Sequence, residues 1–152
     1  MIRQTQTSWT ANRIVALVLG IIFTLLGVIG FFTPAENSTG VQAIFGIFDA
    51  DLLHNIIHLL TGLLGILAAY MDQPRGFNKS FGIFYILLGL LGLIPALYFP
   101  AGSYGTDHGL FLGLIHLNAG DHFLHIIAGL IAVVVGFFVT DSGRLRRSAT
   151  PV

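Results

Sequence analysis

The chain has 152 residues and a formal net charge of zero, with 55% hydrophobic and only 9% charged residues. Soluble domains carry about 25% charged residues, so this composition excludes a water-soluble globular protein and indicates a bilayer as the solvent. Zero net charge argues against nucleic acid as a partner, because phosphate binding needs a basic excess. The absence of cysteine excludes disulfides, iron–sulfur clusters and thiolate metal sites.

Four apolar stretches divide the chain, and each is close to the roughly 20 residues that a membrane-spanning helix needs. They cover residues 14–32, 52–70, 81–99 and 119–140. The first is longer than the roughly 7–15 apolar residues of a secretory signal peptide, and no A-x-A cleavage site follows it. It therefore predicts an uncleaved first helix, capped by Thr10 or Asn12. Pro95 is predicted to kink or end the third helix.

Two shorter apolar runs precede the second and fourth stretches, "VQAIFGIF" at residues 41–48 and "GLFLGLIHL" at residues 109–117. Neither is long enough to span a bilayer. Each is predicted to form a short interfacial or partly re-entrant helix against the outer leaflet. The alternative is an extended hydrophobic loop.

The basic residues predict the orientation of the chain. With four spans, all of them fall on one side, at the N-terminus, in the loop between the second and third spans, or in the tail 141–152. They are Arg3, Arg13, Arg75, Lys79, Arg144, Arg146 and Arg147. The positive-inside rule then places both termini and that tail in the cytoplasm. The six histidines fall on or near the opposite, outer side; they are His54, His58, His108, His116, His122 and His125.

The sequence also indicates an internal duplication. "GIIFTLLGVIGFF" in the first stretch matches "GIFYILLGLLGLI" in the third, and "IFGIFDADLLHNIIHLLTG" matches "FLGLIHLNAGDHFLHIIAG". The repeats cover about residues 13–71 and 81–140 of a single membrane domain. Because each contains two spans, both insert the same way round, and the pseudo-two-fold axis runs along the membrane normal. The predicted fold is an all-α integral membrane protein of four helices in two parallel repeats.

A polar cap leading into an N-x-x-H-x-x-x-G pattern, after a "GLF"-like run, occurs in both halves. In the first half Asn55, His58 and Gly62 fit this pattern, and in the second half His125 and Gly129 fit it. The chain in this respect resembles the bacterial family catalogued as domain of unknown function 4383, over about residues 13–139. The sequence departs from the pattern at His122, which stands where asparagine is expected. The resemblance implies a four-helix membrane protein, mostly from bacteria, and supplies no activity. The predicted location is the bacterial inner membrane.

Small residues recur at helical spacing in the second and fourth stretches. Such spacing lets helix backbones approach closely, so these residues are expected to face another helix rather than lipid. The candidate packing residues are Gly62, Gly65, Gly129 and Gly136.

Polar residues continue these faces toward the outer end. His54 lies four residues before His58, and Asp121 lies four residues before His125, so each pair shares a helix face. His54, His58, Asp121 and His125 are therefore predicted to converge where the second and fourth helices meet. Asn55 and His122 lie about 100° round each helix, where they flank this cluster or point to the first and third helices.

Two interpretations of this cluster remain open from the sequence. Three imidazoles and a carboxylate suit zinc or another divalent ion, and His58 with His125 could ligate a haem or each hold a chlorophyll. Alternatively, the histidines only hydrogen-bond across helices, while Asp121 completes a capping box with Asn118. The inner halves of the spans contain no acid, histidine or lysine, which excludes a proton pump.

The favoured functional hypothesis is a non-catalytic membrane scaffold or accessory subunit of a larger complex, or a homo-oligomer, in contact with lipid. The runner-up is a small protein that binds a metal or tetrapyrrole through His58 and His125, assisted by His54 and Asp121. An enzyme with a zinc-activated water is a third, less favoured hypothesis, because it needs an outward-facing cleft.

Overall fold

The computed structural model describes residues 9–36, 38–99 and 110–141. Its long elements are the helices α1 (Ala11–Phe32), α2 (Leu52–Tyr70), α3 (Pro74–Gly92) and α4 (Ala119–Phe138). Of these, α1, α2 and α4 are long and apolar enough to cross a membrane. The predictions for His108, for the loop 100–109 and for the tail beyond Asp141 lie outside the described residues.

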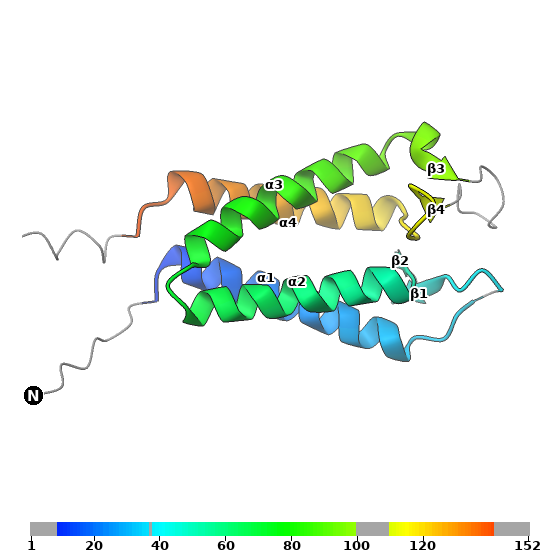
Figure 1. Cartoon of the computed structure of the whole chain (residues 1–152), viewed down its shortest axis with the longest axis horizontal. Coiled ribbons are helices and arrows are strands. Elements are labelled where there is room, and N and C mark those ends of the chain that lie inside the picture. Colours follow the sequence, from blue (N-terminus) through cyan, green and yellow to red (C-terminus); the bar gives the residue numbers. More distant parts are fainter. Residues whose placement is uncertain (1–8, 37, 100–109, 142–152) are drawn as a thin grey trace, which may run out of the picture.

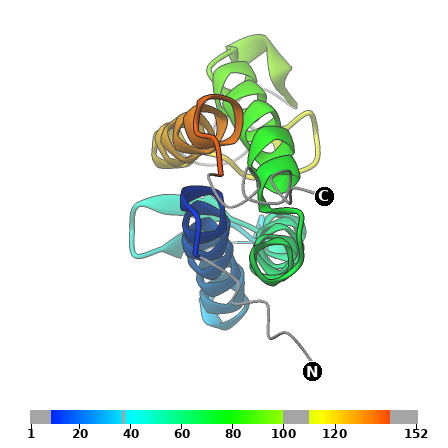
Figure 2. The same ribbon diagram turned by 90° about the vertical axis from the view of Figure 1, so that its left-hand side faces the viewer.

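The helices form two hairpin-like pairs, α1 with α2 and α3 with α4 (Figure 1). Viewed end-on, α1 lies next to α2 and α4, and α3 lies next to α4 and α2, so α2 and α4 are diagonal (Figure 2). We call the end of the bundle that carries the β-strands the hairpin end. The opposite end, with Arg13, Arg75 and Lys79, is the basic end.

The third helix begins and ends earlier in the chain than the apolar stretch predicts. It was predicted over residues 81–99 but runs from Pro74 to Gly92 and ends before Pro95, which begins the 3-10 turn η1 (Pro95–Leu97). Proline suits the first turn of a helix, and the polar side chains that follow it find partners in the bundle. Arg75 donates from Nε to the carbonyl of Gly136 (2.9 Å), and Asn78 donates from Nδ2 to the carbonyl of Asn12 (3.0 Å).

The two predicted pre-helices are wrong, and antiparallel strand pairs stand in their place. The first pair is β1 (Gln42–Ile44) with β2 (Phe48–Ala50), and the second is β3 (Tyr98–Phe99) with β4 (Leu110–Phe111). We call residues 42–50 the first hairpin, and residues 110–115, where the chain after β4 turns back so that Ile115 pairs with Phe111, the second hairpin. The extended alternative was therefore nearer to the structure.

Left-handed backbone explains why these segments are not helical. Phe45 and Gly46 have φ values of 56° and 66°, and Leu112 and Gly113 have 52° and 71°. Two successive positive φ values are the signature of a type I′ turn, which reverses a strand and cannot continue a helix. Ile47 and Leu114 close the two turns with backbone hydrogen bonds of 3.1 and 3.0 Å. Positions that the proposed repeat relates thus share the same unusual conformation.

Glycine sets the distance between helices within each pair. A Cβ on Gly65 would lie 3.0 Å from the carbonyl oxygen of Ala16 in α1, and one on Gly129 would lie 2.8 Å from the backbone nitrogen of Ile86 in α3. Gly62 and Gly136 lie against α1 and α3 in the same way. These glycines therefore do not bring α2 and α4 together.

The centre of the bundle is aromatic. Phe23 of α1 and Tyr85 of α3 are fully buried, and their ring centroids are 4.7 Å apart in an edge-to-face arrangement. Phe81 packs on both rings. We call Phe23, Phe81 and Tyr85 the aromatic layer; it fills the space between the two helix pairs.

Gly129→Ala is expected to lower the free energy of unfolding by about 1–3 kcal/mol, because the added methyl group must push backbone atoms of α3 aside. Gly76→Ala is the matched control, since among the described residues, its own helix backbone aside, the added Cβ would meet only Oε1 of the Gln73 side chain, at 3.7 Å. Thermal unfolding in detergent measures both. Equal midpoints for the two variants would contradict the close approach of α3 and α4.

Candidate metal centre between α2 and α4

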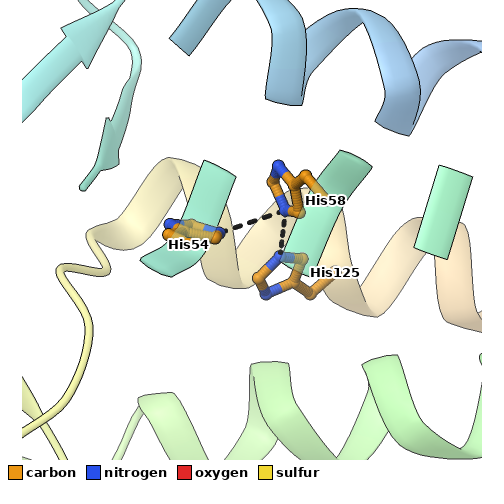
Figure 3. A group of neighbouring side chains, drawn as sticks. All are labelled: His54, His58 and His125. Carbon is orange, nitrogen blue, oxygen red and sulfur yellow. Dashed lines mark hydrogen bonds between the residues drawn. The ribbon is translucent and has the colours of Figure 1, made fainter. Parts of the chain in front are cut away.

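Three histidines meet in the interior near the hairpin end. The Nε2 atoms of His54 and His58 are 3.1 Å apart, and those of His58 and His125 are 3.4 Å apart. Figure 3 shows the three rings with these nitrogens turned toward one another. All three side chains are at most 3% exposed. Their ring nitrogens form a compact group whose ligand atoms lie within 4.8 Å of one another. We call His54, His58 and His125 the histidine triad.

Helix capping brings these side chains into register. Asp51 caps α2 by accepting a hydrogen bond from the backbone N–H of His54 (2.9 Å), which starts the helix so that His54 and His58 share one face. Asn118 caps α4, and Asp121 reaches back to the backbone N–H of Asn118 (2.9 Å), completing a capping box.

The hairpins tie the two helix starts together across the bundle. Asp51 accepts from the backbone N–H of His116 (2.7 Å), next to the second hairpin. Asp121 accepts from the backbone N–H of Asp49 (3.1 Å), in the first hairpin. Each half of the chain therefore holds backbone of the other half with a carboxylate. We call these two hydrogen bonds the crossed ties.

His54 is the best-oriented member of the triad. Its Nδ1 lies 3.1 Å from the carbonyl oxygen of Asp49 and 3.1 Å from that of His116. Since both neighbours are acceptors, Nδ1 carries the proton, and neutral His54 presents the lone pair of Nε2 to the other two rings.

Asp121 lies outside the triad, although it was predicted to join it. Its buried carboxylate accepts from the backbone of Asp49 and Asn118 and is part of the capping box. The structure thus brings together three of the four predicted ligands, and the fourth organises the backbone around them.

Asn55 and His122 point away from the triad, toward α1 and α3. Asn55 donates from Nδ2 to Oε1 of Gln42 (2.6 Å) and packs where Gly30 leaves room. Nε2 of His122 lies 3.0 Å from the hydroxyl oxygen of Tyr98, and the His122 ring packs against Gly92. From the sequence, these two residues either flank the cluster or point to the first and third helices. The structure has the second arrangement.

The aromatic layer closes the triad on the side of the basic end. The ring of Phe23 lies edge-to-face with that of His58, at 4.9 Å between centroids, and Tyr85 lies similarly at 5.0 Å from His125. Among the described residues, the Nδ1 atoms of His58 and His125 have no hydrogen-bond partner.

An apolar pocket of about 220 Å³ adjoins the triad. All three histidines line it, together with residues of α2, α3 and the second hairpin. Its other lining residues are Leu53, Ile57, Phe84, Tyr85, Leu88, Phe111, Leu112, Leu114 and Ile115.

Sequence reasoning missed a second buried polar group, at the basic end. Asn12 and Asn78 are fully buried, and Asn78 donates from Nδ2 to Oδ1 of Asn12 (3.1 Å). Asn12 in turn donates to the carbonyl of Val139 (3.2 Å). Asn12 was a candidate cap, but Thr10 caps α1 instead. The signal in the sequence that could have indicated this group is a single asparagine next to each of two apolar runs.

A tetrapyrrole does not fit this site. The Nε2 atoms of His58 and His125 are only 3.4 Å apart and enclosed by the rings of Phe23 and Tyr85, so a macrocycle could not enter between them without separating the helices. A peripheral chlorophyll needs an exposed ring nitrogen, and both histidines are buried.

Fold and composition define a class, that of helical membrane proteins with a histidine group buried between helices. The chain belongs to the family described as domain of unknown function 4383, whose profile matches residues 13–138. This match confirms the resemblance seen in the sequence. No curated protein and no solved structure is significantly similar to the chain.

Asp121→Ala is expected to lower the free energy of unfolding by about 1–3 kcal/mol, because two backbone N–H groups lose their acceptor. Asp72→Ala removes an exposed carboxylate that pairs with Arg13 and serves as the control; exposed pairs of this kind contribute about 0–1 kcal/mol. Denaturant titration in detergent compares them, and an equal loss in both variants would contradict the crossed ties.

Proposed function

We propose that this protein binds one divalent transition-metal ion in the membrane, with zinc as the best match, through His54, His58 and His125. The observation that carries the proposal is the spacing of the three nitrogens. Zinc–nitrogen bonds of about 2.0–2.1 Å at tetrahedral angles place ligand nitrogens about 3.3–3.4 Å apart. Two of the three pairs in the triad show 3.1 and 3.4 Å, and all three nitrogens lie within 4.8 Å of one another.

The surroundings of His54 support the same proposal. A metal-binding histidine typically donates its other N–H to a carbonyl or carboxylate, which fixes the ring and its tautomer. His54 has this arrangement with the carbonyls of Asp49 and His116. Imidazole is a common ligand for zinc, copper, iron and nickel, and a chain without cysteine offers no thiolate that would compete for the ion.

The competing candidate is a scaffold or accessory subunit in which the triad only joins the two helix pairs. The same short distance between His54 and His58 favours it, because Nε2–H of His58 can donate to the lone pair on Nε2 of His54. The outward faces of the helices carry many exposed leucine, isoleucine and phenylalanine side chains, which suit lipid, a partner subunit or a second copy alike.

Elemental analysis of the protein purified in mild detergent and dialysed against zinc tests the two candidates. About one zinc per chain is expected, and His58→Gln or His125→Gln is expected to lower the affinity at least tenfold, since each removes one of three ligands. His122→Gln is the matched control, because His122 is also a buried histidine but lies outside the triad.

Zinc retained equally by all of these variants would show a site elsewhere and overturn the proposal. Protein that takes up no zinc, copper or cobalt, and that is merely less stable without His58, would favour the scaffold instead.

For membrane placement we propose four spans, with α3 as the fourth, built by duplication of a two-helix unit. Nineteen residues at about 1.5 Å each give α3 a length close to that of the hydrocarbon core. Arg75 and Lys79 lie at its basic end, where they reach the headgroups. The concentration of positive charge at this end supports cytoplasmic termini and a bacterial inner-membrane location.

Single cysteines test this orientation, because the chain has none of its own. Ser38→Cys lies beyond the hairpin end of α1, and Gln73→Cys lies between α2 and α3; both positions are exposed. A membrane-impermeant maleimide is expected to label Ser38→Cys in intact cells and Gln73→Cys only after permeabilisation. The reverse pattern would place the basic end outside, and labelling of both in intact cells would contradict the four-span arrangement.

A further inference from the structure

The triad and its pocket together point to a lipid-derived ligand. We propose that the carboxylate of a fatty acid occupies the fourth coordination position of the triad-bound metal, with the first part of its acyl chain in the 220 Å³ pocket. This inference rests on the proposed function, since it requires the metal ion.

We place the fourth position on the side of the pocket. Three protein ligands leave a tetrahedral ion one open position, and all three histidines contribute to the pocket wall. Phe23, which does not line the pocket, packs against His58. The pocket is therefore a space next to the triad from which a fourth ligand can arrive.

Charge favours an anionic ligand. Three neutral imidazoles leave a bound zinc with its full double positive charge in surroundings of low polarity, which is costly. The nearest buried carboxylate, Asp121, serves backbone N–H groups and lies outside the triad. A carboxylate brought by the ligand would neutralise half of the charge and offers the oxygen that zinc accepts.

The remaining lining selects an apolar chain. Apart from the triad and Tyr85, the pocket is lined by leucine, isoleucine and phenylalanine side chains. Hydroxide would find no hydrogen-bond partner in this part of the wall. Phe84, Leu112 and Leu114 are 52%, 50% and 61% exposed, so the rim of the pocket lies on the apolar surface that meets lipid. A ligand can thus enter from the bilayer without crossing water.

Size and depth agree with a fatty acid. The pocket is smaller than the roughly 300–1,000 Å³ of sites that enclose a whole ligand, so it takes the head and the first methylenes while the tail extends into lipid. The triad lies in the first two turns of α2 and α4, near the level of the headgroups in that leaflet. An acyl chain running from it toward the bilayer centre keeps its usual direction.

Cobalt provides the test, because its visible absorption reports the ligands of a tetrahedral site. The full chain in detergent is loaded with Co²⁺ and titrated with decanoate, and with decanol as the probe that has the same chain but no carboxylate. Decanoate is expected to change the cobalt spectrum with an apparent dissociation constant at least tenfold lower than that of decanol. Ile57→Trp fills the pocket and is expected to lower decanoate affinity at least tenfold while cobalt stays bound.

Leu60→Trp is the matched control, since Leu60 lies on the same helix, is 57% exposed and does not line the pocket. If Ile57→Trp loses cobalt, Leu53→Trp at the exposed rim replaces it. Cobalt bound without any response to decanoate would overturn this inference and leave the proposed function standing. Decanoate that binds equally to metal-free protein would overturn the coordination. Failure to bind cobalt or zinc at all would overturn the proposed function itself.

Discussion

The crossed ties are the interaction on which the rest of this end of the molecule depends. Asp51 caps α2 and Asp121 completes the capping box of α4, and each carboxylate also accepts a backbone hydrogen bond from the opposite half of the chain. The buried carboxylate of Asp121 and the partly buried one of Asp51 are stable there because backbone N–H groups satisfy them. By fixing the hairpins over the helix starts, they also place the carbonyls of Asp49 and His116 beside Nδ1 of His54. The orientation of the triad follows from the same few bonds.

The helices pack closely within each pair and less closely between the pairs, and this difference leaves room for the pocket. Glycine lets α1 approach α2, and α3 approach α4, until backbone meets backbone. Between the pairs, large side chains such as Phe23 and Tyr85 keep the helices apart. The larger separation between α2 and α3 leaves apolar space beside the triad. Glycines therefore compact each pair, whereas large side chains keep the two pairs apart.

Much of the architecture could be predicted from the sequence, because bilayer length and apolar runs constrain helices strongly. The apolar criterion failed where polar residues are satisfied inside the bundle, as for Asn78 at the start of α3. It failed again at Phe45–Gly46 and Leu112–Gly113, where a turn conformation overrides an apolar run. Spacing of four residues correctly brought His54 and His58 to one face. It could not show that Asp121 serves the backbone, since that depends on hairpins the sequence did not reveal.

The position of the triad decides what kind of function it can support. It lies at one end of the bundle, and the aromatic layer separates it from the buried asparagines at the basic end. A transported ion would need a continuous series of polar groups past Phe23 and Tyr85, whereas the described core there is mainly aromatic and aliphatic, with the hydroxyl of Tyr85 hydrogen-bonded to that of Thr61. The triad adjoins an apolar pocket whose rim carries exposed apolar side chains. A site closed toward the basic end and open toward lipid is suited to holding a ligand from the membrane, and this favours binding over conduction.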